Sequence, residues 1–486
     1  MKAEFSEYLT QTAPAIRTMI ARLQEHFDYV SVLATDSTGF RISISQKARD
    51  ISSETMMTER GNVIRVYRDG LYSEYAFNEP DLAHPEAQAE TIRQALEKQI
   101  ELLRLTGTEV YETGKLADEP QELFVEMETG TMPEDADLDS LVKELTAVSD
   151  AAMKQGEHLI DCRLTAQSTH VCKMFLTPNR DLRQSYVYSE GTVMPMAMKD
   201  GRMEYSYAGV AERQGPEIFA GLRDKMQEAV RIAEELLTAE RIEPGEYDVI
   251  TTPEVSGLIA HEAFGHGVEM DMFVKNRALG KEYIDKRVGS DLVTMHEGAL
   301  AAVNVASYAF DDEGTAAGDV IEIDHGILKT GVCDALSALR LGVQPTGNGK
   351  RENFEHKAYT RMTNTIFEPG NDSLDDMIAS IDYGYLLAGM QSGMEDPKHW
   401  GIQCIIERGY EIRDGRLTGR VVTPIIMTGY VPDVLGNITM ASRETEVFGT
   451  GGCGKGYKEW VKVSDGGPYL KTKARLGRCL KNRRNC

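Results

Sequence analysis

The feature that most constrains this chain is the stretch from His261 to Asp271, which reads HEAFGHGVEMD. It places two histidines five positions apart, with a glutamate directly after the first. In a regular α-helix, residues four apart differ by about 40° and share a face, whereas residues five apart differ by about 140°. Zinc binds imidazole nitrogens at about 2.0–2.1 Å in a tetrahedral shell. His261 and His266 can therefore hold one ion only if the helix widens into a π-bulge, or ends, between them.

The glycines of this stretch favour a metal-binding interpretation. Gly265 precedes His266 and Gly267 follows it. Glycine lowers the cost of a local distortion, and π-bulges gather at functional sites. The spacing is that of the helical zinc-peptidase signature HExxH with one residue added. The alternative is a helix that carries two unrelated histidines and incidental glycines.

A third ligand has to come from elsewhere in the chain, because a catalytic zinc usually has three protein ligands and one open position. Cys453 is the candidate, since its small neighbours in VFGTGGCGKG let a thiolate approach an ion closely. A buried or idle thiol is the alternative, and it is the interpretation that we prefer for the other cysteines. The loop also matches GxGxxG and GxxxxGK. A strand-like segment follows it, however, and Gly456 stands where a P-loop needs serine or threonine, so nucleotide binding is not assigned.

Glu262 is the candidate general base, because a carboxylate beside a zinc-bound water can take its proton as the water attacks a carbonyl. A glutamate solvated on the helix surface is the alternative. Asp271 could orient an imidazole, or could simply lie on the C-terminal face of the helix. Arg361, in the segment RMTNT, could bind a peptide carboxylate or form a local salt bridge. Asn364 of the same segment is a further candidate for substrate binding or ligand orientation.

Composition limits the class of protein. The 486 residues suggest two to four domains, and the hydrophobic content of 41% and charged content of 27% are typical of a soluble globular protein. A net charge of −24 disfavours nucleic acid and anionic membrane as partners. The chain has no run of 18 apolar residues and no signal-peptide core at its N-terminus. Seven scattered cysteines do not form a disulfide framework, so we expect a reducing, cytoplasmic location.

Hydrophobic periodicity predicts an α+β fold, with an N-terminal α/β domain that has an antiparallel sheet and a β-rich C-terminal domain. The C-terminal domain is expected to be barrel- or sandwich-like and to carry the HExxxH helix. The predicted boundaries are an N-terminal domain at 1–210, a connecting helix within 211–245, a β-rich metallopeptidase domain at 246–477 and a basic tail at 478–486.

Three local predictions test this interpretation. Asp69-Gly70, between two alternating runs, is the strongest hairpin signal in the chain. Residues 107–139, with two prolines among acidic residues, read as a loop or crossover. Residues 303–310 read as a strand of the C-terminal domain.

HEAFGHGVE, RMTNT and GGCGKG, in this order, resemble the metal-bearing TldD branch of the TldD/PmbA metallopeptidase family. The resemblance covers most of the chain. It implies that His261, His266 and Cys453 are zinc ligands and that Glu262 is the catalytic acid/base. It also implies a dimer, often a heterodimer with a related metal-free subunit, that cuts short or unfolded peptides in peptide-antibiotic maturation and antitoxin turnover. The basic, cysteine-containing tail departs from the family pattern.

The expected function is therefore a zinc-dependent metallopeptidase for short or unfolded peptides, with a metal-bound water activated by Glu262. An extended peptide could be held by adding a strand to a sheet edge. The first alternative is a non-catalytic, zinc-containing, peptide-binding subunit of a hetero-oligomer. A fourth protein ligand would favour it, because structural zinc sites are closed. The second alternative is a zinc amidase for a small substrate, which a closed pocket would favour.

Overall fold

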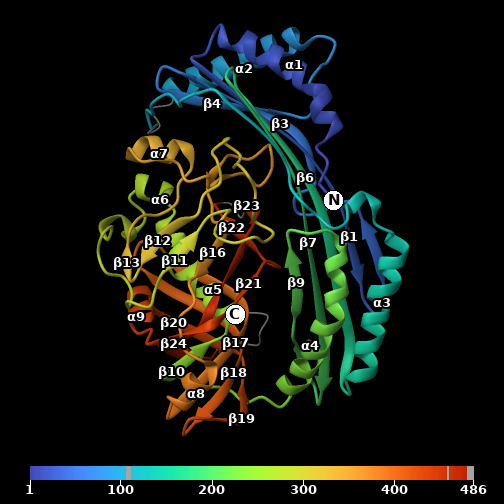
Figure 1. The fold of residues 1–486 in the computed structure, drawn as a ribbon, viewed down its shortest axis with the longest axis vertical. Coiled ribbons are helices and arrows are strands. Elements are labelled where there is room, and N and C mark those ends of the chain that lie inside the picture. Colours follow the sequence, from blue (N-terminus) through green and yellow to red (C-terminus); the bar gives the residue numbers. More distant parts are fainter. Residues whose placement is uncertain (106–110, 457–458, 479–486) are drawn as a thin grey trace.

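The computed structural model describes residues 1–105, 111–456 and 459–478, and it shows an α+β protein built on two large sheets (Figure 1). The predicted fold class is confirmed. The predicted basic tail falls almost entirely outside the described residues. Within the described residues, no helix is long and apolar enough to cross a membrane.

The N-terminal sheet has nine strands, with the order β4-β3-β1-β6-β7-β5 and with β2, β8 and β9 added at its margins. Its neighbours are antiparallel except for β5 and β7, which run parallel. The strands are β1 (Tyr29–Ile44), β2 (Arg49–Ser52), β3 (Glu59–Arg68), β4 (Leu71–Phe77), β5 (Gln121–Glu126), β6 (Leu159–Leu176), β7 (Arg180–Lys199), β8 (Arg202–Tyr205) and β9 (Ala208–Glu212).

Four helices cover this sheet in two pairs. Helices α1 (Glu7–Gln24) and α2 (Pro85–Leu105) form one core with β1, β3 and β6. Helices α3 (Leu138–Gln155) and α4 (Leu222–Leu236) form a second core at the other end of the long strands (Figure 1). Helix α4 falls in the segment that was expected to connect the domains, and its apolar stripe packs on the N-terminal sheet.

The C-terminal sheet closes on itself. Strands β10, β17, β18, β20 and β24 follow one another, and β10 also pairs with β24, so that these five strands form a barrel. Of the two predicted architectures, the structure has the barrel. Its strands and those that extend it are β10 (Gly245–Thr251), β11 (Met295–Glu297), β12 (Val320–Asp324), β13 (Ile327–Leu328), β16 (Asn364–Phe367), β17 (Tyr383–Asp396), β18 (Gly401–Arg413), β19 (Arg416–Val422), β20 (Ile425–Tyr430), β21 (Met440–Phe448) and β24 (Ser464–Gly477).

Short elements complete this half of the chain. They include two small hairpins, β14 (Gly349–Lys350) with β15 (Tyr359–Thr360) and β22 (Gly452–Lys455) with β23 (Glu459–Lys462). The helices are α5 (Pro253–Ile259), α6 (Asp271–Val274), α7 (Ala335–Leu341), α8 (Leu374–Ala379) and α9 (Val431–Gly436). Helix α5 lies in the main core of the domain, where Val255 and Leu258 pack with barrel residues such as Ile402.

The three local predictions have different outcomes. The Asp69-Gly70 hairpin is confirmed, with φ of 54° and 84° at the two residues between β3 and β4. The segment 107–139 also contains strand β5, which periodicity did not reveal. The predicted strand at 303–310 is wrong. Ser307 there accepts from the Asn304 N–H and donates to the Ala302 carbonyl, and such local bonds hold a turn where a ladder was expected.

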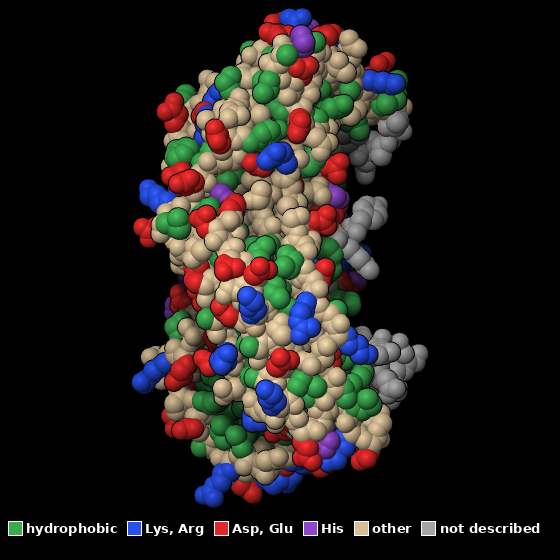
Figure 2. Space-filling view, turned by 90° about the vertical axis from the view of Figure 1, so that its right-hand side faces the viewer, with side chains coloured by type: hydrophobic (Ala, Val, Ile, Leu, Met, Phe, Trp, Pro, Cys, Tyr) green, Lys and Arg blue, Asp and Glu red, His purple; other side chains and the backbone are tan. Residues whose placement is uncertain are grey.

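Buried ion pairs join the two domains. Lys173 of β6 pairs with Asp312, and both side chains are less than a tenth exposed. Arg65 of β3 pairs with Glu313, which is also buried. On the outer surface, by contrast, acidic and basic side chains are interspersed over the face shown in Figure 2. The interface between the domains therefore contains charge pairs that solvent and salt screen little.

Candidate metal centre

The helix that carries the two histidines widens at the predicted place. Helix α5 continues directly into a π-helical turn, Ala260–Gly265, and the His266 N–H donates to the carbonyl of His261 five residues earlier. This turn adds one residue to the helical repeat and so brings His266 back towards the face of His261. The centroids of the two imidazole rings lie 5.1 Å apart. Of the two predicted possibilities, a π-bulge or the end of the helix, the structure has the π-bulge.

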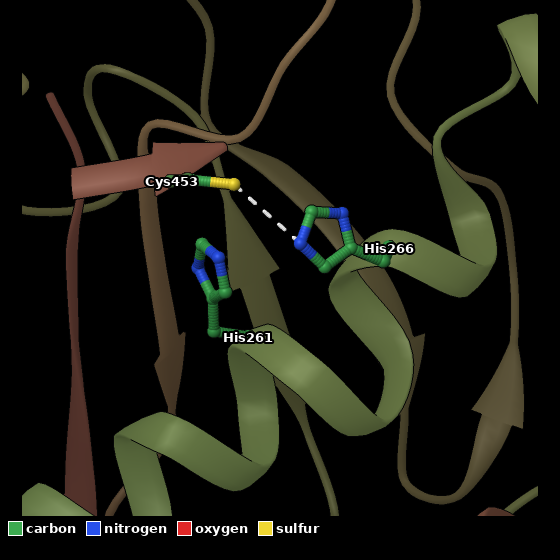
Figure 3. A group of neighbouring side chains, drawn as sticks. All are labelled: His261, His266 and Cys453. Atoms are coloured by element: carbon green, nitrogen blue, oxygen red, sulfur yellow. Dashed lines mark hydrogen bonds between the residues drawn. The ribbon is translucent and has the colours of Figure 1, made fainter. Parts of the chain in front are cut away.

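A hairpin from the distant C-terminal part of the chain covers this turn. Cys453 lies on β22 of the β22–β23 hairpin, directly opposite Val461. Its Sγ lies 3.5 Å from Nε2 of His266 (Figure 3). One ligand atom from each of His261, His266 and Cys453 lies within 4.8 Å of the others. The structure thus brings together the three residues that the sequence analysis expected to meet.

The electrostatics of the cluster favour an ionised thiol. Burial alone would raise the pKa of Cys453, but the two neighbouring imidazoles outweigh it and hold this pKa well below its usual value. Burial would lower the pKa of His261, but Cys453 raises it to about 9. Cys453 and Glu269 likewise raise the pKa of His266. These neighbouring charges favour the thiolate form of Cys453, which is the form of cysteine that binds metal ions.

His266 is oriented by a buried carboxylate. Its Nδ1–H donates to Oε2 of Glu269 at 3.0 Å, which leaves Nε2 facing Cys453. Lys455 lies 3.0 Å from the same Glu269 oxygen and 2.8 Å from Oδ1 of Asp271. Burial would raise the pKa of Glu269, but Lys455 and His266 lower it to about 2. A carboxylate behind a ligating imidazole fixes the tautomer and the ring direction.

The other candidate residues take up supporting positions. Asp271 reaches the cluster through Lys455 and also binds Lys275. Arg361 is buried, and it donates to the carbonyl of Cys453 at 2.6 Å and to that of Glu459 at 3.0 Å. Arg361 thus holds the β22–β23 hairpin. Asn364 is also buried and donates to the Gly298 carbonyl at 3.0 Å.

The glycines around His266 make space for neighbouring side chains. Gly265 has helical angles, φ −54° and ψ −55°, so an L-residue could adopt its backbone. A Cβ added there would lie 2.1 Å from Sδ of Met362, which is fully buried. A Cβ added at Gly267 would lie 2.7 Å from Oε1 of Glu395. Close packing, more than backbone freedom, requires glycine at both places.

Glu262 lies beside the cluster, with its side chain over Gly393 of β17. Glu395, two residues further along the same strand, has both carboxylate oxygens buried with no hydrogen-bond partner among the described residues. Burial raises the pKa of Glu395 to about 9, and Glu262 adds to that rise. Sequence reasoning did not single out Glu395, and no motif signals it. Lys455 was also missed, although it stands two residues after Cys453, because its partners are distant in the sequence.

The donor set fits zinc. Two imidazole nitrogens and one thiolate are the ligands that zinc prefers among protein side chains. Nδ1 of His261 is buried with no hydrogen-bond partner among the described residues, so that it is free to bind an ion. The cluster holds three histidine, cysteine or carboxylate ligands among the described residues. Three ligands correspond to a catalytic site, whereas structural zinc sites have four.

Comparison with known proteins assigns the C-terminal half of the chain to a family. Residues 244–474 match the model of the PmbA/TldA metallopeptidase C-terminal domain. This part of the chain is therefore a domain of the PmbA/TldD metallopeptidase type. The match contains α5, the π-turn and the β22–β23 hairpin, so it includes the whole histidine–cysteine cluster.

Named relatives come from archaea and bacteria. A metalloprotease of Methanocaldococcus jannaschii is 32% identical over 281 residues, which is 57% of this chain and 60% of that protein. A metalloprotease of Synechocystis is 26% identical over 93% of this chain and 95% of its own length. A zinc metalloprotease TldD homolog of Saccharolobus solfataricus is 33% identical over 47% of this chain and 51% of that protein. The matches to the first and third relatives thus span less than two thirds of those proteins.

The overall fold has a relative of known structure. TldE from Thermococcus kodakarensis superposes with a TM-score of 0.76 over 96% of this chain and all of that chain, at 17% identity. At this identity, the likeness shows the fold alone. The N-terminal sheet and the barrel domain therefore occur together in another member of the same structural group.

Proposed function

We propose that this protein is a zinc-dependent peptidase in which His261, His266 and Cys453 hold the metal. The observation that carries the proposal is the convergence of the three side chains, one from the π-turn, one from the residue directly after it and one from a hairpin 187 residues after His266. When bound, zinc polarises the carbonyl of a peptide bond and lowers the pKa of a coordinated water. The names of the relatives, metalloproteases and a zinc metalloprotease, support this class of chemistry.

Glu262 is proposed as the general acid/base. It directly follows His261 and is held over Gly393 of β17, so that its carboxylate lies beside the ligands without joining them. In this role the carboxylate takes a proton from the attacking water and returns it to the leaving amine. Glu269, acting through His266, keeps the imidazole aligned during this transfer.

The substrates that we propose are short or unfolded peptides. We further propose that the protein acts as a dimer, with itself or with a related subunit that lacks the metal ligands. The five cysteines that the structure describes are free thiols, which agrees with the reducing conditions of the cytoplasm. The non-catalytic alternative would need a closed shell of ligands, and the three-ligand cluster of the described residues argues against it.

One experiment tests the proposal. Zinc content and cleavage of an unfolded peptide library are measured for the purified protein, alone and with a related subunit. Glu262→Ala should keep its zinc and lose about 10²–10⁴-fold in cleavage rate, since that is what one general acid/base contributes. Glu282→Ala, which alters an exposed glutamate, is the matched control. Full activity of Glu262→Ala would eliminate the proposed mechanism, and unchanged zinc binding in Cys453→Ser would eliminate the proposed ligand set.

A further inference from the structure

The hairpin that carries Cys453 is too small to hold its own position. Strands β22 and β23 have four residues each, and they pair only with each other among the described strands. An isolated two-stranded hairpin is marginally stable in water. A metal ligand has to be placed within tenths of an ångström, because zinc–sulfur bonds are about 2.3 Å long. The position of Cys453 must therefore come from contacts outside the hairpin.

Buried basic side chains provide these contacts. Arg361 donates to the carbonyl of Cys453, and Lys350 donates to the carbonyl of Lys462 at 2.6 Å. The ammonium of Lys462, the last residue of β23, donates to the carbonyl of Gly451 at 2.8 Å. This bond links the end of β23 to the residue directly before β22. Lys455 joins the hairpin to Asp271. All these anchors belong to the C-terminal half of the chain.

One anchor reaches the other domain. The ammonium of Lys462 also pairs with Oε2 of Glu190, which lies on β7 of the N-terminal sheet. The two side chains are 5% and 10% exposed, so that water screens this pair little. The second oxygen of Glu190 accepts from Gln167, its cross-strand neighbour on β6. Glu190 is thus fixed within the sheet before it meets Lys462.

The N-terminal domain contacts the same segment at two further points. The hydroxyl groups of Tyr207 and Thr450 are hydrogen-bonded at 2.9 Å. A Cβ added at Gly452, the residue before Cys453, would lie 3.1 Å from Cε of Met56. The segment that leads to Cys453 therefore contacts the N-terminal domain at Thr450 and at Gly452.

We infer that Glu190 is a positioning residue for Cys453, and that the N-terminal domain completes a metal centre whose ligands all lie in the C-terminal domain. The inference rests on the proposed role of Cys453 as a zinc ligand. It follows that zinc binding and the packing of the two domains are coupled, because both depend on the position of one hairpin. Neither the motif around His261 nor the loop around Cys453 contains Glu190.

The test uses the full-length protein and Glu190→Gln. Zinc affinity is measured by competition with a chromogenic chelator, and cobalt(II) replaces zinc so that the sulfur-to-cobalt charge-transfer band reports the bond to Cys453. Glu190→Gln should weaken zinc binding about 10–100-fold, the range for groups that orient metal ligands, and should weaken the charge-transfer band. The melting temperature of the metal-free protein is recorded in parallel.

Two further variants separate positioning from general damage. Asp312→Asn breaks another buried ion pair between the domains, that with Lys173, and should lower the melting temperature while leaving zinc affinity unchanged. Glu190→Gln combined with Lys462→Met leaves no unpaired buried charge, and should recover thermal stability without recovering zinc affinity.

Three results would overturn the inference. They are wild-type zinc affinity in Glu190→Gln, an equal loss in Asp312→Asn, and full recovery of zinc affinity in the double variant. Cys453→Ser distinguishes these results from a failure of the proposed function. If Cys453→Ser binds zinc as the wild type does, the metal centre itself is wrong. If Cys453→Ser loses zinc affinity and Glu190→Gln keeps it, the metal centre stands and the positioning role falls.

Discussion

The bond between His266 and Glu269 gives the sharpest prediction about the metal centre. Glu269 is 2% exposed and accepts from Nδ1 of His266 at 3.0 Å, so it sets which nitrogen of the ring faces Cys453. Glu269→Gln preserves the shape of the side chain and an oxygen acceptor, but it removes the charge. The carboxylate then no longer stabilises the ring orientation that zinc requires.

The expected loss follows from the contacts of Glu269. Mutating a group that orients a metal ligand typically weakens metal binding about 10–100-fold, which corresponds to about 1.4–2.7 kcal/mol at 25 °C. Lys455, the other partner of Glu269, keeps Asp271 at 2.8 Å in the variant. No buried cation is therefore left unpaired, and the loss should appear in zinc affinity more than in the stability of the metal-free protein.

Asp271→Asn is the matched control. It removes the other carboxylate that pairs with Lys455, but among the described residues Asp271 forms its ion pairs with Lys275 and Lys455 and not with His266. Zinc affinity is measured by chelator competition, and thermal unfolding of the metal-free protein is followed by circular dichroism. We expect Glu269→Gln to weaken zinc binding at least tenfold more than Asp271→Asn. Equal effects of the two variants would refute the argument, because they would show that the charge of Lys455, and not the direction of His266, controls the site.

Three further predictions concern packing and stability. Gly265→Ala should destabilise the fold by about 1–3 kcal/mol through overpacking against Met362, less the roughly 1 kcal/mol that alanine gains in a helix. In a Met362→Ala background, Gly265→Ala should instead stabilise the fold. If denaturant unfolding shows that Gly265→Ala is destabilising in this background too, the packing argument is contradicted. Gly70→Ala should lower the free energy of unfolding by about 1–2 kcal/mol through backbone strain, because φ is 84° and an added Cβ would meet no atom closer than 3.7 Å. An unchanged free energy of unfolding would exclude backbone strain at this position. Burial and then Arg361 lower the pKa of Lys350 from 10.5 to about 7, so the unfolded chain binds more protons between these values. Lys350 should therefore make the free energy of unfolding rise with pH between about 7 and 10.5, and Lys350→Met should lack this rise. If the free energy of unfolding of the wild type and of Lys350→Met changes with pH in parallel, the argument is refuted.

Local patterns were sufficient for several features. The alternating runs around Asp69-Gly70 predicted the hairpin, because the turn chemistry and the strand pattern lie in the same fifteen residues. For a shared ion, the five-residue spacing of His261 and His266 required the helix to widen or to end between them, because the angular step per residue is fixed by backbone geometry. Strand β5 and the segment 303–310 were misjudged, each for its own reason. A parallel partner on β7 stabilises β5, whereas side-chain bonds of Ser307 hold a turn.

By itself, the sequence determined that the helix widens or ends between the histidines, and it determined the candidate ligands and the α+β class, since these follow from spacing, residue type and periodicity. Only the tertiary structure decided how the metal centre is held. Three contacts each join residues about a hundred or more positions apart. They are the Glu269–Lys455 ion pair, the hydrogen bond from Arg361 to the Cys453 carbonyl and the Glu190–Lys462 ion pair. Such contacts leave no local pattern, because the energy of a buried charge depends on what surrounds it in space and not on its neighbours in the chain. The histidine pair thus indicates that a third ligand is required, and the packing of the two domains determines the position of that ligand.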